Sequence, residues 1–394
     1  MYNECISSNI LNLKGEKRMV IMKLKLNNIF SFKNFDINFT YPKKIKNSLV
    51  QHEYLASNES FRYKKLNIFI GSNASGKTSL IRSIWQILLF LSKKESAPIE
   101  RIVNKNYDSS QIEIDVVEEY NNDSYLHRLN IVTKNTETFE IKISHKKINI
   151  NSSISYEKAI SKLEKLKTNY HDYLDVLNEC NFNIGWFTAL PSTEESFNYI
   201  SFENTKTKEE ENEYINILFN VLKTLDPSIL NVRKSKDSKK AIVITHESNP
   251  SLIIQQGMDL SSIQLLSSGT KYGINIANLI YAIKKHRNGI YLIDEQFPYV
   301  NSDIEISMLA TMASMLNQGE QIFFTTHNTN ILSLSFPIHS FYFLNKNNPE
   351  NRITITCASD FENRNNVSVK NMYDNDIFNT APNTNNIIGL SNDE

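Results

Sequence analysis

Residues 66–91 read LNIFIGSNASGKTSLIRSIWQILLFL, an apolar run and a helix-like run joined by a short polar loop. The first run is rich in β-branched and aromatic residues and ends at Gly71, which is typical of a buried strand. The second has a helical pattern from about Lys77 to Ser92. Between them, two of only ten glycines stand five positions apart, followed at once by a lysine and a hydroxyl residue. The loop is therefore either an ordinary turn or a cradle for phosphate.

The motif favours the phosphate cradle, because it matches G-x-x-x-x-G-K-[ST] with a strand before it and a helix after it. Glycines let the backbone close around an anion, and successive N–H groups at the helix start point at phosphate oxygens. Lys77 would reach the terminal phosphates of ATP, and the Thr78 hydroxyl would bind Mg²⁺. The predicted ATP-binding residues here are Gly71, Ser72, Asn73, Ala74, Ser75, Gly76, Lys77, Thr78 and Ser79.

The composition is that of a globular chain without an overall charge. The 394 residues suit one large domain with an insertion, or two domains. Basic and acidic side chains number 43 each, so no global field would hold nucleic acid, although local patches remain open.

Cysteine spacing and hydropathy indicate where the protein works. Cys5, Cys180 and Cys357 form no CxxC pair, which favours free thiols in a reducing cytoplasm over disulfides or a zinc site. No apolar run reaches membrane-spanning length. We therefore expect a cytoplasmic protein without a membrane partner.

Apolar patterns along the chain predict an α/β fold with a mixed sheet. Three alternating stretches separated by turn residues predict an antiparallel β meander, at 111–120, 125–132 and 139–150. Strand-like and helix-like stretches then alternate towards the C-terminus, which indicates a parallel sheet covered on both faces. These stretches lie at 271–286, 289–295, 302–316, 321–327 and 336–345.

A short helical insertion is expected between the meander and this second half. Apolar residues from Tyr156 to Leu177 recur at spacings of three and four, and 209–225 is a second amphipathic stretch. Gly185 and Pro191 supply turn signals between them. Two ordinary surface helices packed on the sheet remain the alternative.

These patterns divide the chain into four parts. Residues 22–154 and 226–370 would form the ATPase domain, and 155–225 the insertion. Residues 1–21 are expected to be non-native or disordered, because codons for 14–17 can contain a ribosome-binding sequence before Met19 or Met22. Residues 371–394 are rich in Asn and Asp and are expected to be a flexible tail.

Acidic residues and a histidine follow two of the predicted strands. GIYLIDE ends in Asp294 and Glu295, at the edge of a parallel sheet where acids face a ligand. Asp294 would hold Mg²⁺ through water, and Glu295 would act as general base on the attacking water. His327 follows the strand FFTT. Each feature alone also suits a solvated strand end or a structural histidine, so their combination with the glycine loop carries the prediction.

Four motifs in this order resemble one family. GSNASGKTSL, LSSGT, YLIDE and FFTTHNTNIL resemble the ABC-type, SMC-like AAA-family ATPases of bacterial antiphage defence. That abortive-infection group includes the ATPase subunits of the PARIS and Septu systems and the ATPase half of the OLD proteins. Phe30 departs from the pattern, because the family often has an arginine there, and Gln111 is the candidate for the Q-loop glutamine.

The resemblance implies a P-loop ATPase that works as a homo-oligomer, at least a dimer. Ser267 and the N–H of Gly269, at a helix start, would bind the γ-phosphate of ATP held by a second subunit, although LLSSGTK alone also suits a plain helix cap. His327 would contact the same phosphate, which makes Lys77, Glu295 and His327 the candidate catalytic residues. Hydrolysis of ATP to ADP and phosphate would then open the dimer.

The resemblance also implies a role as a sensor and regulator in antiphage defence. The ATPase would control a separate toxic effector, expected to be a nuclease, and a phage-encoded trigger and DNA remain open as partners. The main alternative is a DNA-maintenance ATPase of the SMC or recombination-mediator type. Lysine clusters at 142–147 and 234–240 would then line a DNA path, although they also suit a solvated surface. A transporter's nucleotide-binding subunit is a third reading, which the meander and the insertion disfavour.

Overall fold

The computed structural model describes residues 6–9, 18–41, 43–44, 48–120, 123–135, 138–151, 153–190, 207–236, 241–247, 251–255, 268–286, 288–297, 300–346, 352–362, 367–380 and 390. Within these ranges the chain forms a mixed α/β fold with several sheets. None of the helices described there combines the length and apolar content that crossing a lipid bilayer requires.

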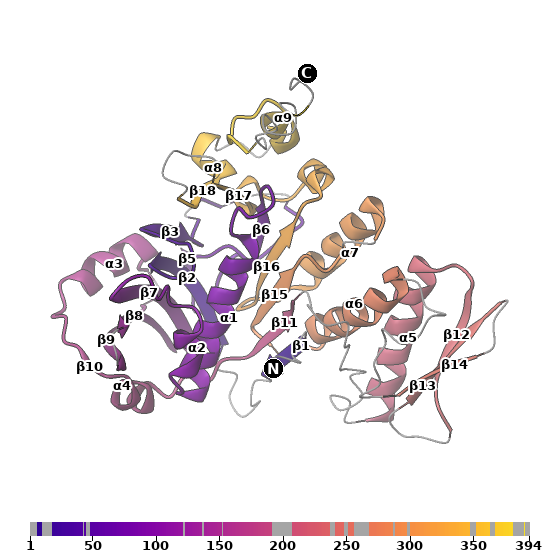
Figure 1. The fold of residues 1–394 in the computed structure, drawn as a ribbon, viewed down its shortest axis with the longest axis horizontal. Coiled ribbons are helices and arrows are strands. Elements are labelled where there is room, and N and C mark those ends of the chain that lie inside the picture. The colour runs from indigo at the N-terminus through magenta and orange to yellow at the C-terminus, as the bar shows by residue number, and fades with distance from the viewer. Residues whose placement is uncertain are drawn as a thin grey trace.

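A seven-stranded mixed sheet forms the centre of the fold (Figure 1). Its order is β1 (Ile6–Asn9), β11 (Trp186–Ala189), β15 (Ile290–Asp294), β16 (Gln321–Thr326), β6 (Leu66–Ile70), β17 (Phe341–Asn345) and β18 (Thr354–Cys357). The five inner strands run parallel, and the outer two pair antiparallel with their neighbours. Every residue of β6, β15 and β16 is buried, as a parallel sheet covered on both faces requires.

Helices cover one face of the central sheet, and a second sheet with a buried helix covers the other. Alternate residues of the central strands point to opposite faces, so Ile68 and Phe69 belong to different apolar cores. The core on the first face includes α6 (Ser268–Lys284) and α7 (Ser302–Met315), and α5 (Lys208–Leu225) packs against α6. On the second, α1 (Lys77–Lys93) lies between the central sheet and the six-stranded sheet (Figure 1).

The six-stranded sheet confirms the predicted β meander. Its order is β10 (His171–Asp172), β9 (Phe139–Asn149), β8 (Asp123–Asn135), β7 (Ser109–Tyr120), β2 (Arg18–Asn27) and β3 (Phe35–Asn38), and all neighbours pair antiparallel. A smaller antiparallel sheet packs beside α5 and consists of β12 (Ile229–Lys234), β13 (Ala241–His246) and β14 (Leu252–Gln255).

The remaining elements are short. They are β4 (Tyr54–Leu55), β5 (Asn58–Arg62), α2 (Ala97–Glu100), α3 (Tyr156–Glu164), α4 (Tyr173–Cys180), η3 (Thr329–Ser333), η4 (Ile338–Ser340), α8 (Ala358–Phe361) and α9 (Val369–Asp374).

The structure contradicts the predicted helical insertion at 155–225. The apolar stripe breaks into α3 and α4, which pack against the meander sheet rather than forming a separate unit. The segment after them forms β11, an inner strand of the central sheet that pairs parallel with β15. α5 packs on α6 within the main core. A strand of four residues after a glycine turn is too short to give a periodic signal, which is why the sequence indicated only a loop.

Both predicted chain ends are also wrong in part. β2 begins at Arg18, and Met19 to Met22 are buried, so the described residues 18–21 belong to the meander sheet. At the other end, the boundary at 371 falls inside α9, and the ring of Phe378 stacks on Phe343 with centroids 3.8 Å apart. Residues 381–389 and 391–394 of the predicted tail lie outside the described residues.

Candidate active site

Three neighbouring strands bring the predicted catalytic motifs to one edge of the central sheet. β15, β16 and β6 are adjacent and parallel, so their carboxyl ends meet at the same edge. The glycine loop follows β6, the acidic pair ends β15, and His327 follows β16. Because β16 lies between the other two strands, His327 is placed between the loop and the acids.

The glycine loop is shaped by two backbone positions with positive φ and by close packing. Ala74 and Gly76 have φ of 62° and 102°, in the left-handed region that favours glycine. A Cβ on Gly71 would lie 2.5 Å from the backbone oxygen of Leu344 in β17. A Cβ on Gly76 would lie 2.6 Å from the side chain of Ile353, just before β18. The loop therefore rests on the β17–β18 hairpin, and only glycine fits at Gly71 without moving it.

We expect Gly71→Ala to lower both stability and ATP affinity. The new methyl group meets a backbone oxygen that cannot move without shifting β17, so a loss of about 1 to 3 kcal/mol is expected. Gly289→Ala is the matched control, because its Cβ would find its nearest atoms at 3.6 Å, and its stability should change by less than about 0.5 kcal/mol. Thermal melts and equilibrium dialysis with ATP measure both. Equal melting temperatures for the two variants would contradict the packing argument.

Lys77 points back into the loop. Its side chain is 3% exposed, and Nζ donates hydrogen bonds to the backbone oxygens of Gly71 at 3.0 Å and Ser72 at 3.2 Å. Nζ also lies 3.5 Å from Glu295 Oε1. Burial lowers the pKa of Lys77, and the carboxylate of Glu295 partly offsets this. The ammonium is thus held inside the loop, where phosphate oxygens would be stronger partners than carbonyls.

Asp294 and Thr78 supply oxygen atoms suited to Mg²⁺. Asp294 is fully buried, and its Oδ1 accepts a hydrogen bond from Thr325 Oγ1 at 2.5 Å. Burial raises the pKa of Asp294, while the hydroxyls of Thr325 and Thr78 lower it. Among the described residues, Oδ2 has no hydrogen-bond partner. A buried carboxylate oxygen without a partner, beside a hydroxyl, fits a hard cation that takes few protein ligands and keeps several waters. No cluster of three or more His, Cys, Asp or Glu suited to a metal occurs in the described part of the chain.

Glu295 connects Lys77 to His327. His327 Nε2 lies 2.9 Å from Glu295 Oε1, the same oxygen that faces Lys77. The hydrogen bond from His327 is the largest cause that lowers the pKa of Glu295, and the charge of Lys77 adds to it. The backbone N–H of Glu295 donates to both oxygens of Thr325, and φ of 44° turns the residue out of the strand. The predicted catalytic residues Lys77, Glu295 and His327 therefore meet at one carboxylate.

The sequence did not reveal the residues that hold this arrangement. Glu305, 5% exposed in the first turn of α7, accepts hydrogen bonds from Thr326 Oγ1 at 2.7 Å and Asn328 Nδ2 at 2.8 Å. The N–H of Asn328 also donates to Thr326 Oγ1 at 2.9 Å. These bonds fix the turn that carries His327. A carboxylate within an apolar helix face was the available signal, but nothing in the sequence pairs it with the turn after β16.

The other predicted residues are placed as follows. Ser72, Asn73 and Ala74 face solvent at least in part, whereas Ser75 is buried and its Oγ has no hydrogen-bond partner within the described residues. Ser79 lies in the first turn of α1.

The predicted contact with a second subunit remains a prediction. Ser267 lies outside the described residues, and Gly269 is in the first turn of α6. Phe30 has φ of 45°, and its oxygen accepts a hydrogen bond from Asn104 Nδ2 at 2.7 Å. Gln111 lies in β7, opposite Asn27 and Val132.

The likeness of this chain to known proteins is structural and distant. No protein-family model matches the sequence. The search of curated proteins likewise gave no match. The chain is similar to an SMC head bound to the C-winged helix domain of ScpA, with a TM-score of 0.44, 15% identity, and coverage of 85% of this chain and 96% of that one.

Two further solved structures show the same degree of likeness. The SMC head domain from Thermotoga maritima has a TM-score of 0.40 and 14% identity. The matched region covers 86% of this chain and 98% of that domain. The recombination mediator protein RecF has a TM-score of 0.40 and 11% identity. The matched region covers 87% of this chain and 100% of the RecF chain. At these identities and TM-scores, the similarities assign no function to this chain.

Proposed function

We propose that this protein binds ATP with Mg²⁺ and hydrolyses it to ADP and phosphate. The observation that supports the proposal is the convergence of the glycine loop with Asp294, Glu295 and His327 at one sheet edge. They surround a buried carboxylate oxygen that has no hydrogen-bond partner within the described residues. The steps below follow from the residues at this edge.

The glycine loop and the start of α1 would bind the phosphates. α1 begins after Gly76 without a side-chain cap and has no acidic residue in its first turn. Its first N–H groups and the positive end of the helix are thus available to an anion. Lys77 Nζ would exchange its bonds to loop carbonyls for bonds to phosphate oxygens, which are charge-assisted and stronger.

Thr78 and Asp294 would hold the metal ion. Bound Mg²⁺ would neutralise charge on the phosphate oxygens. Thr78 Oγ1 offers one ligand, and Asp294 Oδ2 would accept a hydrogen bond from a metal-bound water. Thr325 keeps Asp294 in place through its bond to Oδ1.

Glu295 would serve as the base in the hydrolysis step. As a water oxygen bonds to the γ-phosphorus and the bond to the β–γ bridging oxygen breaks, the water proton passes to the Glu295 carboxylate. Its lowered pKa keeps this carboxylate ionised at neutral pH. His327 orients the carboxylate through the 2.9 Å contact, and Lys77 offsets the charge on the transferred phosphoryl group.

The metal part of the proposal is tested with Asp294→Asn. A buried carboxylate whose folded pKa is raised costs stability once pH rises above its unfolded pKa, so the neutral amide should stabilise the fold at pH 7. We expect the melting temperature to rise by about 1 to 3 °C. The Mg²⁺-dependent gain in ATP affinity, measured by dialysis with and without Mg²⁺, should disappear. An unchanged Mg²⁺ dependence would contradict the assigned role.

The finer proposal is that two chains share each nucleotide and that the ATPase regulates a separate toxic effector in antiphage defence. The order of the four sequence motifs supports it. Affinity purification from the native host, with neighbouring genes intact, should recover a nuclease that is released on phage infection. Recovery of this chain alone, together with ATPase activity stimulated by DNA, would favour DNA maintenance instead.

A further inference from the structure

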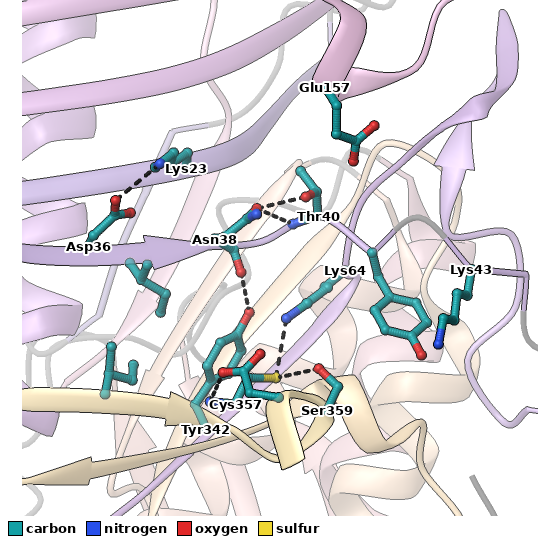
Figure 2. A pocket seen from close by; sticks show the side chains of 14 residues that line it. Lys23, Asp36, Asn38, Thr40, Lys43, Lys64, Glu157, Tyr342, Cys357 and Ser359 are labelled. Atoms are coloured by element: carbon teal, nitrogen blue, oxygen red, sulfur yellow. Dashed lines mark hydrogen bonds and ion pairs between the residues drawn. The ribbon is translucent and has the colours of Figure 1, made fainter. Parts of the chain in front are cut away.

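A cavity of about 560 Å³ lies among the side chains that Figure 2 shows. Its walls come from β2, β3 and the chain after β3, from α3, and from the β17–β18 hairpin with the start of α8. None of the described residues of the proposed ATP site lines it. The polar residues that matter most are Lys64, Tyr342, Cys357 and Ser359, which Figure 2 shows close together at one end.

Lys64 is a buried cation that forms no ion pair with a carboxylate of the described residues. It is 3% exposed, and Nζ lies 4.5 Å from the centroid of the Tyr342 ring. Nζ donates a hydrogen bond to Cys357 Sγ at 3.3 Å, and no carboxylate of the described residues lies within ion-pair distance of it. A thiol sulfur is a weak acceptor, so among the described residues the ammonium has no strong hydrogen-bond acceptor. Burying an ammonium in this way is costly unless an anion compensates it.

The other charges on the wall do not supply that anion. Asp36 pairs with Lys23 at 3.1 Å, and Asp360 accepts the N–H of Cys357 at 3.0 Å in the cap of α8. Glu157 is exposed in α3, and Lys43 is exposed on the facing wall. Lys64 Nζ contacts the sulfur at 3.3 Å, whereas Asp360 bonds to the backbone N–H of the same residue.

We propose that this cavity is a second ligand site, which binds a small anion bearing a carboxylate or phosphate group on Lys64. Cys357 lines the same end, so an anionic electrophile bound there would react with its sulfur. The site is also linked to the glycine loop through the β17–β18 hairpin. Tyr342 and Cys357 face the cavity, while Leu344 and Ile353 of the same hairpin pack against Gly71 and Gly76. Ligand in the cavity would thus influence ATP binding, a consequence that rests on the proposed function.

Alkylation of Cys357 tests the ligand site without any nucleotide. Iodoacetate is anionic and iodoacetamide is neutral; in both, sulfur bonds to the methylene carbon, iodide leaves, and the thiol proton goes to solvent. Peptide mass spectrometry gives the rate with iodoacetate divided by the rate with iodoacetamide, and this ratio is measured at each cysteine. Cys180 is the internal control, because it is half-buried and its Sγ lies 3.3 Å from His145 Nδ1. The ratio at Cys357 should exceed that at Cys180 by at least about fivefold, since a nearby cation attracts the anionic reagent.

Two variants and two competing anions complete the test. Lys64→Met fills the same space without charge and should reduce the ratio to that of Cys180, while Lys64→Arg should preserve it. Inorganic phosphate or acetate should slow the reaction of Cys357 with iodoacetamide, and the more effective of the two identifies the ligand class. Equal ratios at the two cysteines, or protection by neither anion, would overturn the proposal even if Lys64→Met failed to fold.

The link to the glycine loop is measured separately. Protein carboxymethylated at Cys357 should bind ATP at least about threefold more weakly than unmodified protein, because the added group displaces the hairpin that supports Gly71 and Gly76. An unchanged ATP affinity would refute the link and leave the ligand site standing. If the unmodified protein bound no ATP, the proposed function would fail, whereas the alkylation results would still decide the ligand site.

Discussion

Lys77→Met is expected to abolish measurable ATP binding while leaving the fold at least as stable as the wild type. The ammonium would make at least two charge-assisted bonds to phosphate, each contributing about 1.5 to 3 kcal/mol. Their loss corresponds to an affinity roughly 100-fold weaker or more. Isothermal titration with ATP and Mg²⁺ measures the loss.

The stability half of this prediction follows from burial. Because burial lowers the pKa of Lys77 below its unfolded value, the fold disfavours the charged form, and this cost is present at neutral pH. Methionine removes the cost and fills the space. It gives up the bonds to the carbonyls of Gly71 and Ser72 and the 3.5 Å contact with Glu295, which together do not offset the burial of the charge. Glu295 keeps its contact with His327.

Lys93→Met is the matched control, because Lys93 is exposed at the other end of the same helix. It should change neither ATP affinity nor melting temperature. Wild-type affinity in Lys77→Met would show that the glycine loop does not bind nucleotide through this ammonium. A large loss of stability would instead mean that the bonds inside the loop outweigh the burial of the charge.

The parts of the fold that the sequence predicts well are those with short-range signals. The run from Leu66 to Leu91 combines a buried strand, a glycine loop and a helix, and each leaves its own pattern within a few residues. The meander strands are long enough to alternate visibly. In contrast, β11 has four residues that are all buried, so it shows no alternation, and its place beside β15 is set by pairing across about one hundred residues.

In the candidate site, too, the sequence predicts residues with short-range signals and misses those placed by tertiary packing. Motifs predicted Lys77, Asp294, Glu295 and His327, because each lies at or shortly after the end of a recognisable strand. They did not predict Glu305, because its bonds to the turn after β16 depend on how α7 lies against that strand. The close approach of Leu344 to Gly71 and of Lys64 to Cys357 likewise arises from chain segments that only tertiary packing brings together.

Glu295→Gln is expected to bind ATP normally and to hydrolyse it about 10² to 10⁴ times more slowly. The amide has the shape of the carboxylate and can still accept a hydrogen bond from His327, but it cannot take a proton from water. Phosphate release measures the rate, and Glu140→Gln is the control because Glu140 is half-exposed on β9. That control should hydrolyse ATP at the wild-type rate.

The same variant reports on stability and on the assembly. His327 and Lys77 hold the pKa of Glu295 below its unfolded value, so this carboxylate stabilises the fold above the unfolded pKa, and the effect is lost as pH falls through the folded pKa. Glu295→Gln should therefore melt slightly below wild type at pH 7, and the difference should vanish in acid.

Because ATP would stay bound between two chains, light scattering should find Glu295→Gln as a dimer in ATP and as a smaller species without it. Hydrolysis at the wild-type rate would mean that another group accepts the proton, and a monomer in saturating ATP would refute the shared nucleotide.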